Sequence, residues 1–481
     1  MHLPSSASMF TGVLLAVATS ASAQVLPHAR TYDIAVCDSD TAQLLRFVDT
    51  DQNGTITEPN GFQVAFDSTV AGSVALQSPC SITFDRGGWQ YTSDFSADVV
   101  MRTLDQNGDG DANDAGEWSV FIDNSNLSGV VFSSALVIRA DAQGGIVGIN
   151  SGAGSQPLDF VWRAFDINQD GDAMDLAEIT IVYDSVAGAF NIAVPFGLCI
   201  EPSTGDLLVA DVNPDVVYRL HDANADGDYY DAGEATIAYN SPVGSPAIKN
   251  VNTVQFAPDG ALFLNDATSD FILRGVDANA DGDWNDAGEM AIFADKTGNS
   301  IGVPANHFGI EIDELGRVFA VENTTAVGDL VVRYADSNGD HDAQDPGEVI
   351  KVYEGAAGPG TVSTLRNIAL IPAPRLEAPA GTSTSSPGLL QLEVHGFESQ
   401  PYQLLFGFVP LGMNASVAPY GYLSYVPFAT LWSASIPVGG IDSLSFSIPA
   451  GLPTPFTIHF SAAVGGPFRT YLTNEQSILF Q

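Results

Sequence analysis

The sequence predicts an all-β protein, built from a ring of six repeated four-stranded units and a small C-terminal β domain. An acidic segment recurs at intervals of 56, 61, 56, 55 and 59 residues. Short apolar runs with strand-like alternation surround each copy. After residue 372 the repeat stops, and a stretch rich in Pro, Ser, Thr and Gly follows. The six copies begin at Asp49, Asp105, Asp166, Asp222, Asp277 and Asp336.

Each repeat has room for four strands. The fourth copy reads "FGLCIEPSTGDLLVADVNPDVVYRL" over residues 196–220, which gives three apolar runs separated by polar turns. "EATIAYN" then follows the acidic segment as a fourth run. Four short strands at this period are typical of the blades of a β-propeller, where each sheet packs face to face on the next. We therefore expect a six-bladed β-propeller over residues 24–372.

The two ends of the repeat region predict how the ring closes. "YDIAVCD" at residues 32–38 matches the second strand of a blade and lacks a first. "STLRNIALIPA" at 363–373 matches a first strand without a blade of its own. One blade with a one-plus-three strand closure would combine them and remove the open edges.

Within the repeats, "PSTGDLLVAD" at 202–211 and "APDGALFLND" at 257–266 resemble NHL-type six-bladed β-propellers. The resemblance covers roughly residues 32–372. It implies that the acid ending the second strand of each blade caps the following turn. We expect the Arg that stands three residues before each acidic segment to pair within its own blade, for example with that acid. These arginines are Arg46, Arg102, Arg163, Arg219, Arg274 and Arg333, and the blade positions hold Asp38, Asp94, Asn150, Asp211, Asp266 and Glu322.

The acidic segment follows the pattern D-x-N-x-D-G-D-x-x-D-x-x-E. Its first six positions resemble an EF-hand calcium loop, in which oxygen ligands stand at positions 1, 3 and 5 and Gly stands at 6. The resemblance assigns ligand roles only there and to the carbonyl at position 7. Position 12 lacks the closing acid of an EF-hand, so the acid at 10 or at 13 closes the site. A solvated acidic turn that binds nothing is the alternative.

Calcium is the favoured cation, with about five sites, because Mg²⁺ prefers compact octahedral sites and Zn²⁺ or Cu²⁺ prefers His and Cys. The first copy keeps Asp49, Asp51 and Asn53 and should bind weakly or not at all. The third copy has Ala177 in place of a late Gly, which is a mild change. The sixth has His341 where Gly is expected, which predicts a strained turn. The candidate metal residues are Asp105, Asn107, Asp109, Asp111, Asp114, Glu117, Asp166, Asn168, Asp170, Asp172, Asp175, Glu178, Asp222, Asn224, Asp226, Asp228, Asp231, Glu234, Asp277, Asn279, Asp281, Asp283, Asp286, Glu289, Asp336, Asn338, Asp340, Asp342, Asp345 and Glu348.

The flanking regions differ in chemistry from the repeats. Residues 1–23 predict a secretory signal peptide, with a short apolar run and a small-x-small cleavage pattern at Ala21-Ser22-Ala23. Residues 373–388 predict a linker, and 389–481 a C-terminal β-sandwich. Its aromatics either form a ligand platform or, as we favour, partly fill the sandwich core. These are Tyr420, Tyr422, Tyr425, Phe428 and Trp432.

The net charge of −42 disfavours nucleic acid as a partner, because phosphates would be repelled. No later segment is apolar enough to span a bilayer. We therefore expect an exported calcium-stabilised binding or structural module whose partner is a protein, a polysaccharide or a cell surface. The alternative is a lactonase- or esterase-type hydrolase with its site in the propeller channel, where Asn252, His307 and Arg366 are the polar candidates.

Three cysteines are too few for a disulfide scaffold. One bridge, between Cys37 and Cys80, is compatible with the predicted strand ends. Cys199 is expected to be a buried filler within a strand.

Overall fold

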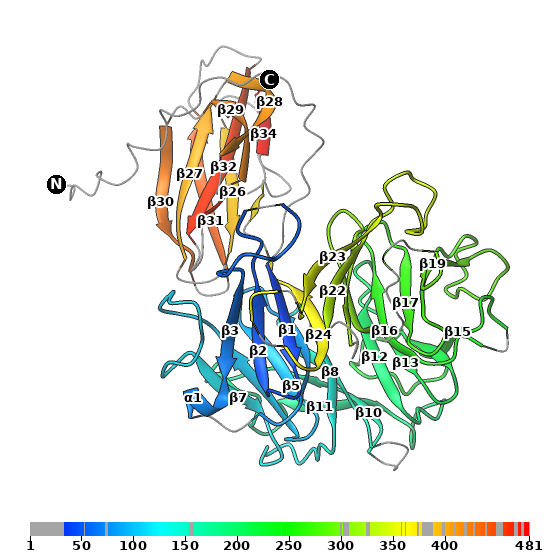
Figure 1. The fold of residues 1–481 in the computed structure, drawn as a ribbon. Coiled ribbons are helices and arrows are strands. Elements are labelled where there is room, and N and C mark those ends of the chain that lie inside the picture. The colour runs from blue at the N-terminus through cyan, green and yellow to red at the C-terminus, as the bar shows by residue number, and fades with distance from the viewer. Residues whose placement is uncertain are drawn as a thin grey trace. The chain divides into compact units, whose positions relative to one another are not determined.

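The computed structural model is an all-β protein (Figure 1). It describes residues 33–480 apart from 52, 73–75, 153–157, 242, 299–300, 302–306, 324–327, 357, 361, 373–374, 378–387, 397–399, 408, 418–420, 427–428, 438–439, 449–455, 466–469 and 473–475. The predicted signal peptide and most of the predicted linker lie outside the described residues. The chain divides into the units Met1–Arg30 and Thr31–Gln481, and every described residue belongs to the second.

The described strands between residues 34 and 370 form six four-stranded antiparallel sheets, each running from its first to its fourth strand. Sheet 1 is β24 (Leu365–Leu370), β1 (Ile34–Asp38), β2 (Gln43–Phe47) and β3 (Phe62–Asp67); sheet 2 is β4 (Pro79–Phe84), β5 (Gln90–Asp94), β6 (Val99–Thr103) and β7 (Trp118–Ile122). Sheet 3 is β8 (Ala135–Ala140), β9 (Ile146–Asn150), β10 (Phe160–Ala164) and β11 (Ile179–Asp184); sheet 4 is β12 (Pro195–Ile200), β13 (Leu207–Asp211), β14 (Val216–Leu220) and β15 (Ala235–Asn240). Sheet 5 is β16 (Val251–Phe256), β17 (Leu262–Asp266), β18 (Phe271–Gly275) and β19 (Met290–Asp295); sheet 6 is β20 (His307–Ile312), β21 (Val318–Glu322), β22 (Leu330–Tyr334) and β23 (Val349–Glu354).

The six sheets form a closed ring. First strands contact one another in the order β24, β4, β8, β12, β16, β20 and back to β24. Sheet 1 takes its first strand from residues 365–370 and its other three from residues 34–67, so both ends of the repeat region share one sheet. This arrangement is that of a β-propeller.

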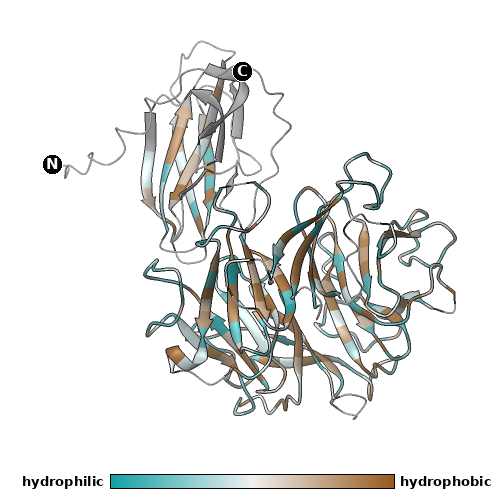
Figure 2. Ribbon diagram, in the orientation of Figure 1, coloured by the Kyte–Doolittle hydropathy of each residue, from teal (hydrophilic) through white to brown (hydrophobic). Residues whose placement is uncertain are grey.

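Apolar contacts lie between the sheets rather than at the centre of the ring. Six hydrophobic clusters of described residues each combine side chains from two adjacent sheets. Because both faces of every sheet are covered, the second strands are buried throughout; all five residues of β13 are buried, for example. Hydrophobic colours accordingly follow the strands in Figure 2, and hydrophilic colours the connections.

Every fourth strand carries a β-bulge at the same place. The pairing of the third with the fourth strand skips one residue in each sheet: Ala65, Phe121, Val182, Ala238, Phe293 and Val352. A bulged residue loses its ladder partner, so its carbonyl needs another donor. The amide of an acidic loop on the following sheet supplies that donor, as described below.

The only described helix is α1 (Ser68–Ala71), whose first turn is capped by Asp67, which accepts from the amide of Thr69. No helix among the described residues has the length and apolar character needed to cross a membrane.

The C-terminal region contains further antiparallel sheets. β25 (Arg375–Glu377), β26 (Gly388–His395) and β31 (Ile441–Ile448) form one of them, and β28 (Val409–Val417) pairs with β29 (Gly421–Val426). The largest contains β30 (Ala429–Ser435), β27 (Pro401–Gly407), β32 (Phe456–Gly465), β33 (Thr470–Leu472) and β34 (Gln476–Phe480). Residues of β26 and β31 share a core with residues of β27 and β32.

Of the predicted aromatic group, only the side chain of Trp432 is described. It is 47% exposed, so it does not fill the core. The side chains of Tyr420, Tyr422, Tyr425 and Phe428 lie outside the described residues.

The bridge that the sequence left open between Cys37 and Cys80 is not formed, because all three cysteines are free thiols. Cys37 is buried in the core between sheets 1 and 2. Cys80 instead directs its Sγ to the carbonyl of Leu136 on sheet 3, at 3.0 Å, and burial raises the pKa of its thiol to about 12. Cys199 is fully buried, as predicted.

Candidate functional site

The acidic segments are loops that join the third strand to the fourth in every sheet. They span residues 49–61, 105–117, 166–178, 222–234, 277–289 and 336–348. Most of their Asp and Asn residues are exposed or half-buried. The predicted site residues therefore lie in five separate loops, one on each of sheets 2 to 6.

One hydrogen bond recurs in all six loops. The carboxylate at position 1 accepts from the amide at position 6, as in the 3.0 Å bond from Gly227 to Asp222. Its equivalents run from Gly54 to Asp49, Gly110 to Asp105, Gly171 to Asp166, Gly282 to Asp277 and His341 to Asp336. This bond orients the first carboxylate, whose other oxygen accepts from a second loop amide, as in the 3.2 Å bond from Asp226 to Asp222. Burial raises the pKa of Asp105, as expected for a carboxyl drawn partly out of water.

The acids at positions 10 and 13 have different surroundings. Glu234, at position 13, is 2% exposed and accepts from the amides of Ala223 and Asp231, both at 3.1 Å. Asp231, at position 10, is exposed, and its Oδ2 accepts from the side-chain amide of Asn224 at 2.6 Å. The same bonds to the Glu recur in the other four loops that carry an acid at position 13. These residues are Glu117, Glu178, Glu289 and Glu348. The Glu braces the loop, and the Asp is the better placed closing ligand.

The first loop gathers three carboxylates that sequence reasoning did not combine. Ligand atoms of Asp49, Asp51 and Glu58 all lie within 4.8 Å of one another. Glu58 stands at position 10, the place of Asp231 in the fourth loop, and "DTDQNGTITEPNG" carries no acid at positions 7 or 13. Burial raises the pKa of Asp49 and of Glu58. Alignment of the first loop with the other five at position 10 could have identified Glu58 from the sequence alone.

Several loop residues adopt the left-handed backbone region without being Gly. His341, where strain was predicted, has φ 73°, and Ala177, which replaces a late Gly, has φ 70°. Ala225 and Ala280, at position 4, have φ 61° and 60°. Such a conformation costs a residue with a Cβ on the order of 1 kcal/mol, so the surrounding contacts hold these loops in shape.

Each loop also joins its own sheet to the preceding one. The amide at position 8 donates to the bulge carbonyl of the preceding fourth strand, so Tyr229 donates to Val182 at 3.0 Å. The other bonds run from Ile56 to Val352, Ala112 to Ala65, Ala173 to Phe121, Trp284 to Ala238 and Ala343 to Phe293, at 2.7–2.9 Å. The first of these joins sheet 1 to sheet 6 and so completes the ring.

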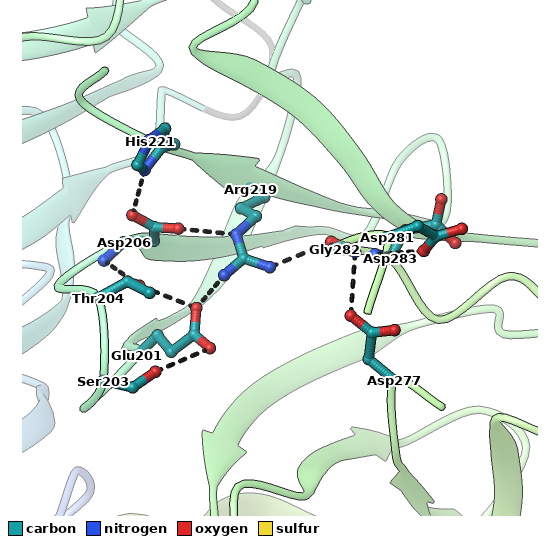
Figure 3. Close-up of polar contacts among 10 residues, drawn as sticks. All are labelled: Glu201, Ser203, Thr204, Asp206, Arg219, His221, Asp277, Asp281, Gly282 and Asp283. Carbon is teal, nitrogen blue, oxygen red and sulfur yellow. Dashed lines mark hydrogen bonds and ion pairs between the residues drawn. The ribbon is translucent and has the colours of Figure 1, made fainter. Parts of the chain in front are cut away.

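The repeated Arg reinforces this joint, as Figure 3 shows for Arg219. Its guanidinium binds Glu201 and, at 2.8 Å, Asp206, both from the turn between the first and second strands of sheet 4. A third bond, of 3.1 Å, reaches the carbonyl of Gly282 in the loop of sheet 5. The pairing within the blade is therefore confirmed, but the partners are acids placed before the second strand and not the acid that ends it. Arg46 and Arg274 likewise pair with acids placed before the second strand, Asp33 and Asp259.

The acids that end the second strands bind backbone amides instead. Asp266 accepts from Thr268 and Ser269 in the following turn, at 3.0 Å, and from Lys249 before the first strand, at 2.7 Å. Asp38, Asp94, Asn150 and Asp211 make corresponding bonds to amides. These side chains satisfy amides at the turns, which leaves none of them for the Arg.

Sheet 6 departs from this pattern. Glu322 is fully buried, and its Oε1 lies 2.8 Å from both His307 Nε2 and the hydroxyl of Tyr334. The predicted residues His307 and Asn252 come together, because the Asn252 side-chain amide donates to the His307 carbonyl at 2.8 Å. Arg366 does not join them; its guanidinium stacks 4.6 Å from the ring of Phe308. His307 Nδ1 and Glu322 Oε2 are buried without a described partner.

No protein-family model matches the chain, and no curated protein matches it in sequence. A chain of the nidogen–laminin complex is 13% identical, with a TM-score of 0.47, covering 71% of this chain and 99% of that one. Virginiamycin B lyase from Staphylococcus aureus is 12% identical, with a TM-score of 0.35, covering 84% and 94%. A gluconolactonase from Xanthomonas campestris is 14% identical, with a TM-score of 0.37, covering 60% and 83%. At these TM-scores the likeness carries no conclusion about activity. The chain is similar to propeller-type proteins in fold.

Proposed function

We propose that this chain is a secreted calcium-binding protein in which a six-bladed β-propeller, stabilised by Ca²⁺, serves as a binding or structural module. The observation that carries the proposal is the six-fold recurrence of one loop structure, with the same carboxylate orientation and the same bond to the preceding sheet. A functional centre used for chemistry is usually single, whereas one loop per sheet serves the fold.

The loop residues fit a hard cation. In the fourth loop Asp222, Asn224 and Asp226 offer oxygen ligands at positions 1, 3 and 5, the carbonyl of Asp228 adds a fourth, and Asp231 closes the set. Oxygen-only ligands of this kind are those that Ca²⁺ prefers. Bound calcium would also relieve the repulsion among five carboxylates within thirteen residues.

Equilibrium dialysis against calcium tests the proposal. We expect about five ions per chain, since five loops carry the full set of acids. Replacing Asp222 and Asp226 together by Asn should remove one ion and leave the others bound. Replacing the half-buried Asp215, which lies outside every loop, is the control. A wild-type stoichiometry near zero would overturn the proposal.

We further propose that the C-terminal sheets form a small β-sandwich that attaches the propeller to a protein, a polysaccharide or a cell surface. Exposed Trp432 supports an interaction role, since a large aromatic there is not needed for the core. Deleting residues 376–481 should abolish association with the cell surface or with insoluble polysaccharide. Calorimetry should show that the propeller transition is retained. Undiminished association of the shortened chain would exclude this role.

The second candidate is a hydrolase with its site near the first strands, and the symmetry break at sheet 6 favours it. A carboxylate that orients an imidazole and leaves one ring nitrogen free is an arrangement used in general base catalysis. Hydrolysis of 4-nitrophenyl acetate or of a simple lactone should then be lost in His307→Gln. Equal rates for that variant and the wild type would exclude it.

A further inference from the structure

Exposed aliphatic side chains gather at the third acidic loop. Among the described residues, ten large hydrophobic side chains are exposed, and four of them belong to this loop or to the connection from β7 to β8 at residues 123–134. They are Leu127, Val131, Ile167 and Leu176, which are 66%, 59%, 65% and 76% exposed. Single apolar residues on a surface are ordinary, whereas a group of them marks a contact surface. These four residues are called the aliphatic patch below.

Hydrogen bonds hold the connection against the third loop. The amide of Leu127 donates to the carbonyl of Met174 at 2.7 Å. The hydroxyl of the next residue, Ser128, donates to the carbonyl of Asp175 at 2.9 Å. The main chain at Leu127 therefore lies beside the part of the loop that leads into Leu176.

The other two members of the aliphatic patch are fixed in the same region. The amide of Ile167 donates to the carboxylate of Glu178 at 2.9 Å, which brings the start of the loop back to its end. Within the connection, the side-chain amide of the buried Asn126 donates to the carbonyl of Val130 at 2.7 Å, which places Val131 close to the start of the connection. The four side chains therefore share one region of the surface, whose main chain is held by hydrogen bonds.

The fold does not require large aliphatic residues at these places. Ile167 stands at position 2 of its loop and Leu176 at position 11. In the other five loops, position 2 holds Thr, Gln, Ala or Ser, and position 11 holds Ala or Pro. The fourth loop forms the same bonds to its position-13 Glu with Ala at both positions. The aliphatic side chains of the third loop are thus suited to contact with another molecule.

The charge around the aliphatic patch restricts what can cover it. Asp166 directly precedes Ile167, and Asp175 directly precedes Leu176. The third loop carries five carboxylates, so one bound Ca²⁺ would leave it with a charge of −5 + 2 = −3. A second copy of this chain, with a net charge of −42, would be repelled, and so would an anionic membrane. The complementary surface is apolar and positively charged.

We propose that the aliphatic patch is a docking surface for a segment of another protein that presents aliphatic side chains flanked by Lys or Arg. The aliphatic side chains of that segment would cover Ile167 and Leu176, and its cations would face the neighbouring aspartates. The surface is separate from the C-terminal sheets. Because calcium in the loop lowers the negative charge without reversing it, docking does not rest on the proposed calcium binding.

Fluorescence anisotropy of the full chain with short labelled peptides tests the proposal, at about 0.15 M salt, where distant surface charges are largely screened. The probe is an amphipathic peptide of Leu and Lys with its leucines on one helical face. Two relatives of the probe replace every Lys by Glu or every Leu by Ser. We expect the Leu and Lys peptide to bind at least about tenfold more tightly than either relative, because one relative is repelled and the other lacks an apolar face.

A double variant, Ile167→Ala with Leu176→Ala, separates docking at the patch from attraction by the overall charge. It gives the third loop the residues that the fourth loop has at both positions, so the loop should fold normally. Its affinity for the Leu and Lys peptide should fall about tenfold or more, since two aliphatic contacts are lost. Val243→Ser is the control, because Val243 is 65% exposed and lies outside the patch.

Three results would overturn the proposal. The first is equal affinity of the wild type and the double variant for the Leu and Lys peptide. The second is tight binding of the Leu and Glu peptide to the wild type. The third is a dimer of the wild type in sedimentation that the double variant does not form, which would assign the surface to a second copy. Melting curves establish that each variant is folded.

Discussion

Removal of calcium with excess EGTA is expected to lower the melting temperature of the propeller by at least about 10 °C. A ligand present at one hundred times its Kd stabilises the folded state by about 2.7 kcal/mol per site. Five such sites would contribute on the order of 13 kcal/mol by the same relation. The effect is large because each loop also carries a bond to the preceding sheet, so a loosened loop weakens a joint of the ring.

Differential scanning calorimetry with and without EGTA measures this shift. Magnesium at the same concentration should restore much less of the melting temperature, since it keeps its water shell in such sites. The variant that replaces Asp222 and Asp226 by Asn should lose only part of the calcium effect. Identical melting curves in calcium and EGTA would contradict the calcium assignment for all loops at once.

Arg219→Met is expected to destabilise the propeller by about 3–5 kcal/mol, the usual cost of removing one partner from a buried ion pair. Arg219 is 15% exposed, and its partners Glu201 and Asp206 are 17% and 6% exposed. Its removal leaves Glu201 and Asp206 without their guanidinium partner and the carbonyl of Gly282 without its side-chain donor. Urea denaturation of the calcium-bound chain measures the change.

Arg274→Met is the matched control. Arg274 stands at the same repeat position, but its partner Asp259 is 57% exposed. Exposed pairs contribute about 0–1 kcal/mol, so this variant should remain close to the wild type. Equal losses for the two variants would show that burial of the partner acids does not set the effect.

The Arg219 effect should also depend on pH. Burial tends to raise the pKa of Asp206, but hydrogen bonds from His221 and Arg219 outweigh it and hold that pKa below the ordinary 3.8. An acid whose pKa is lowered on folding adds stability above its unfolded pKa, and that stability is lost as the pH falls through the folded pKa. The difference between the wild type and Arg219→Met should therefore be full at pH 6 and shrink below pH 4.

The repeat period and the strand alternation were enough to predict an all-β ring of four-stranded units. Both signals are local, because turn residues and alternating burial are set within each repeat. The ligand role of the carboxylate at position 1 came from the same local pattern and stays a prediction, whereas its bond to position 6 is seen in all six loops. Left-handed backbone at His341 followed from its place in a Gly position.

Side-chain contacts between different strands and between repeats could not be predicted in this way. The pairing of Arg219 with Asp206 depends on which strand ends share an edge of the sheet, and the bond to Gly282 depends on how neighbouring sheets are staggered. Cys37 and Cys80 stand at adjacent strand ends in the sequence pattern, but Cys80 faces sheet 3. In the sequence, the buried Glu322 is equivalent to the residues that end the other second strands. Only its contacts with His307 and Tyr334 distinguish it from them.

The bond between a bulge carbonyl and the next loop is the same at all six joints, including the joint between sheets 6 and 1. Each repeat therefore carries an acceptor, the bulge carbonyl of its fourth strand, and a donor, the amide at position 8 of its loop. A repeat of this kind can be duplicated or lost as a unit, because each of its two neighbours already presents the donor or the acceptor that it needs. The number of sheets in the ring then depends on the angle between neighbouring sheets. Insertion of an extra repeat between Asn240 and Val251 would test directly whether the ring can widen.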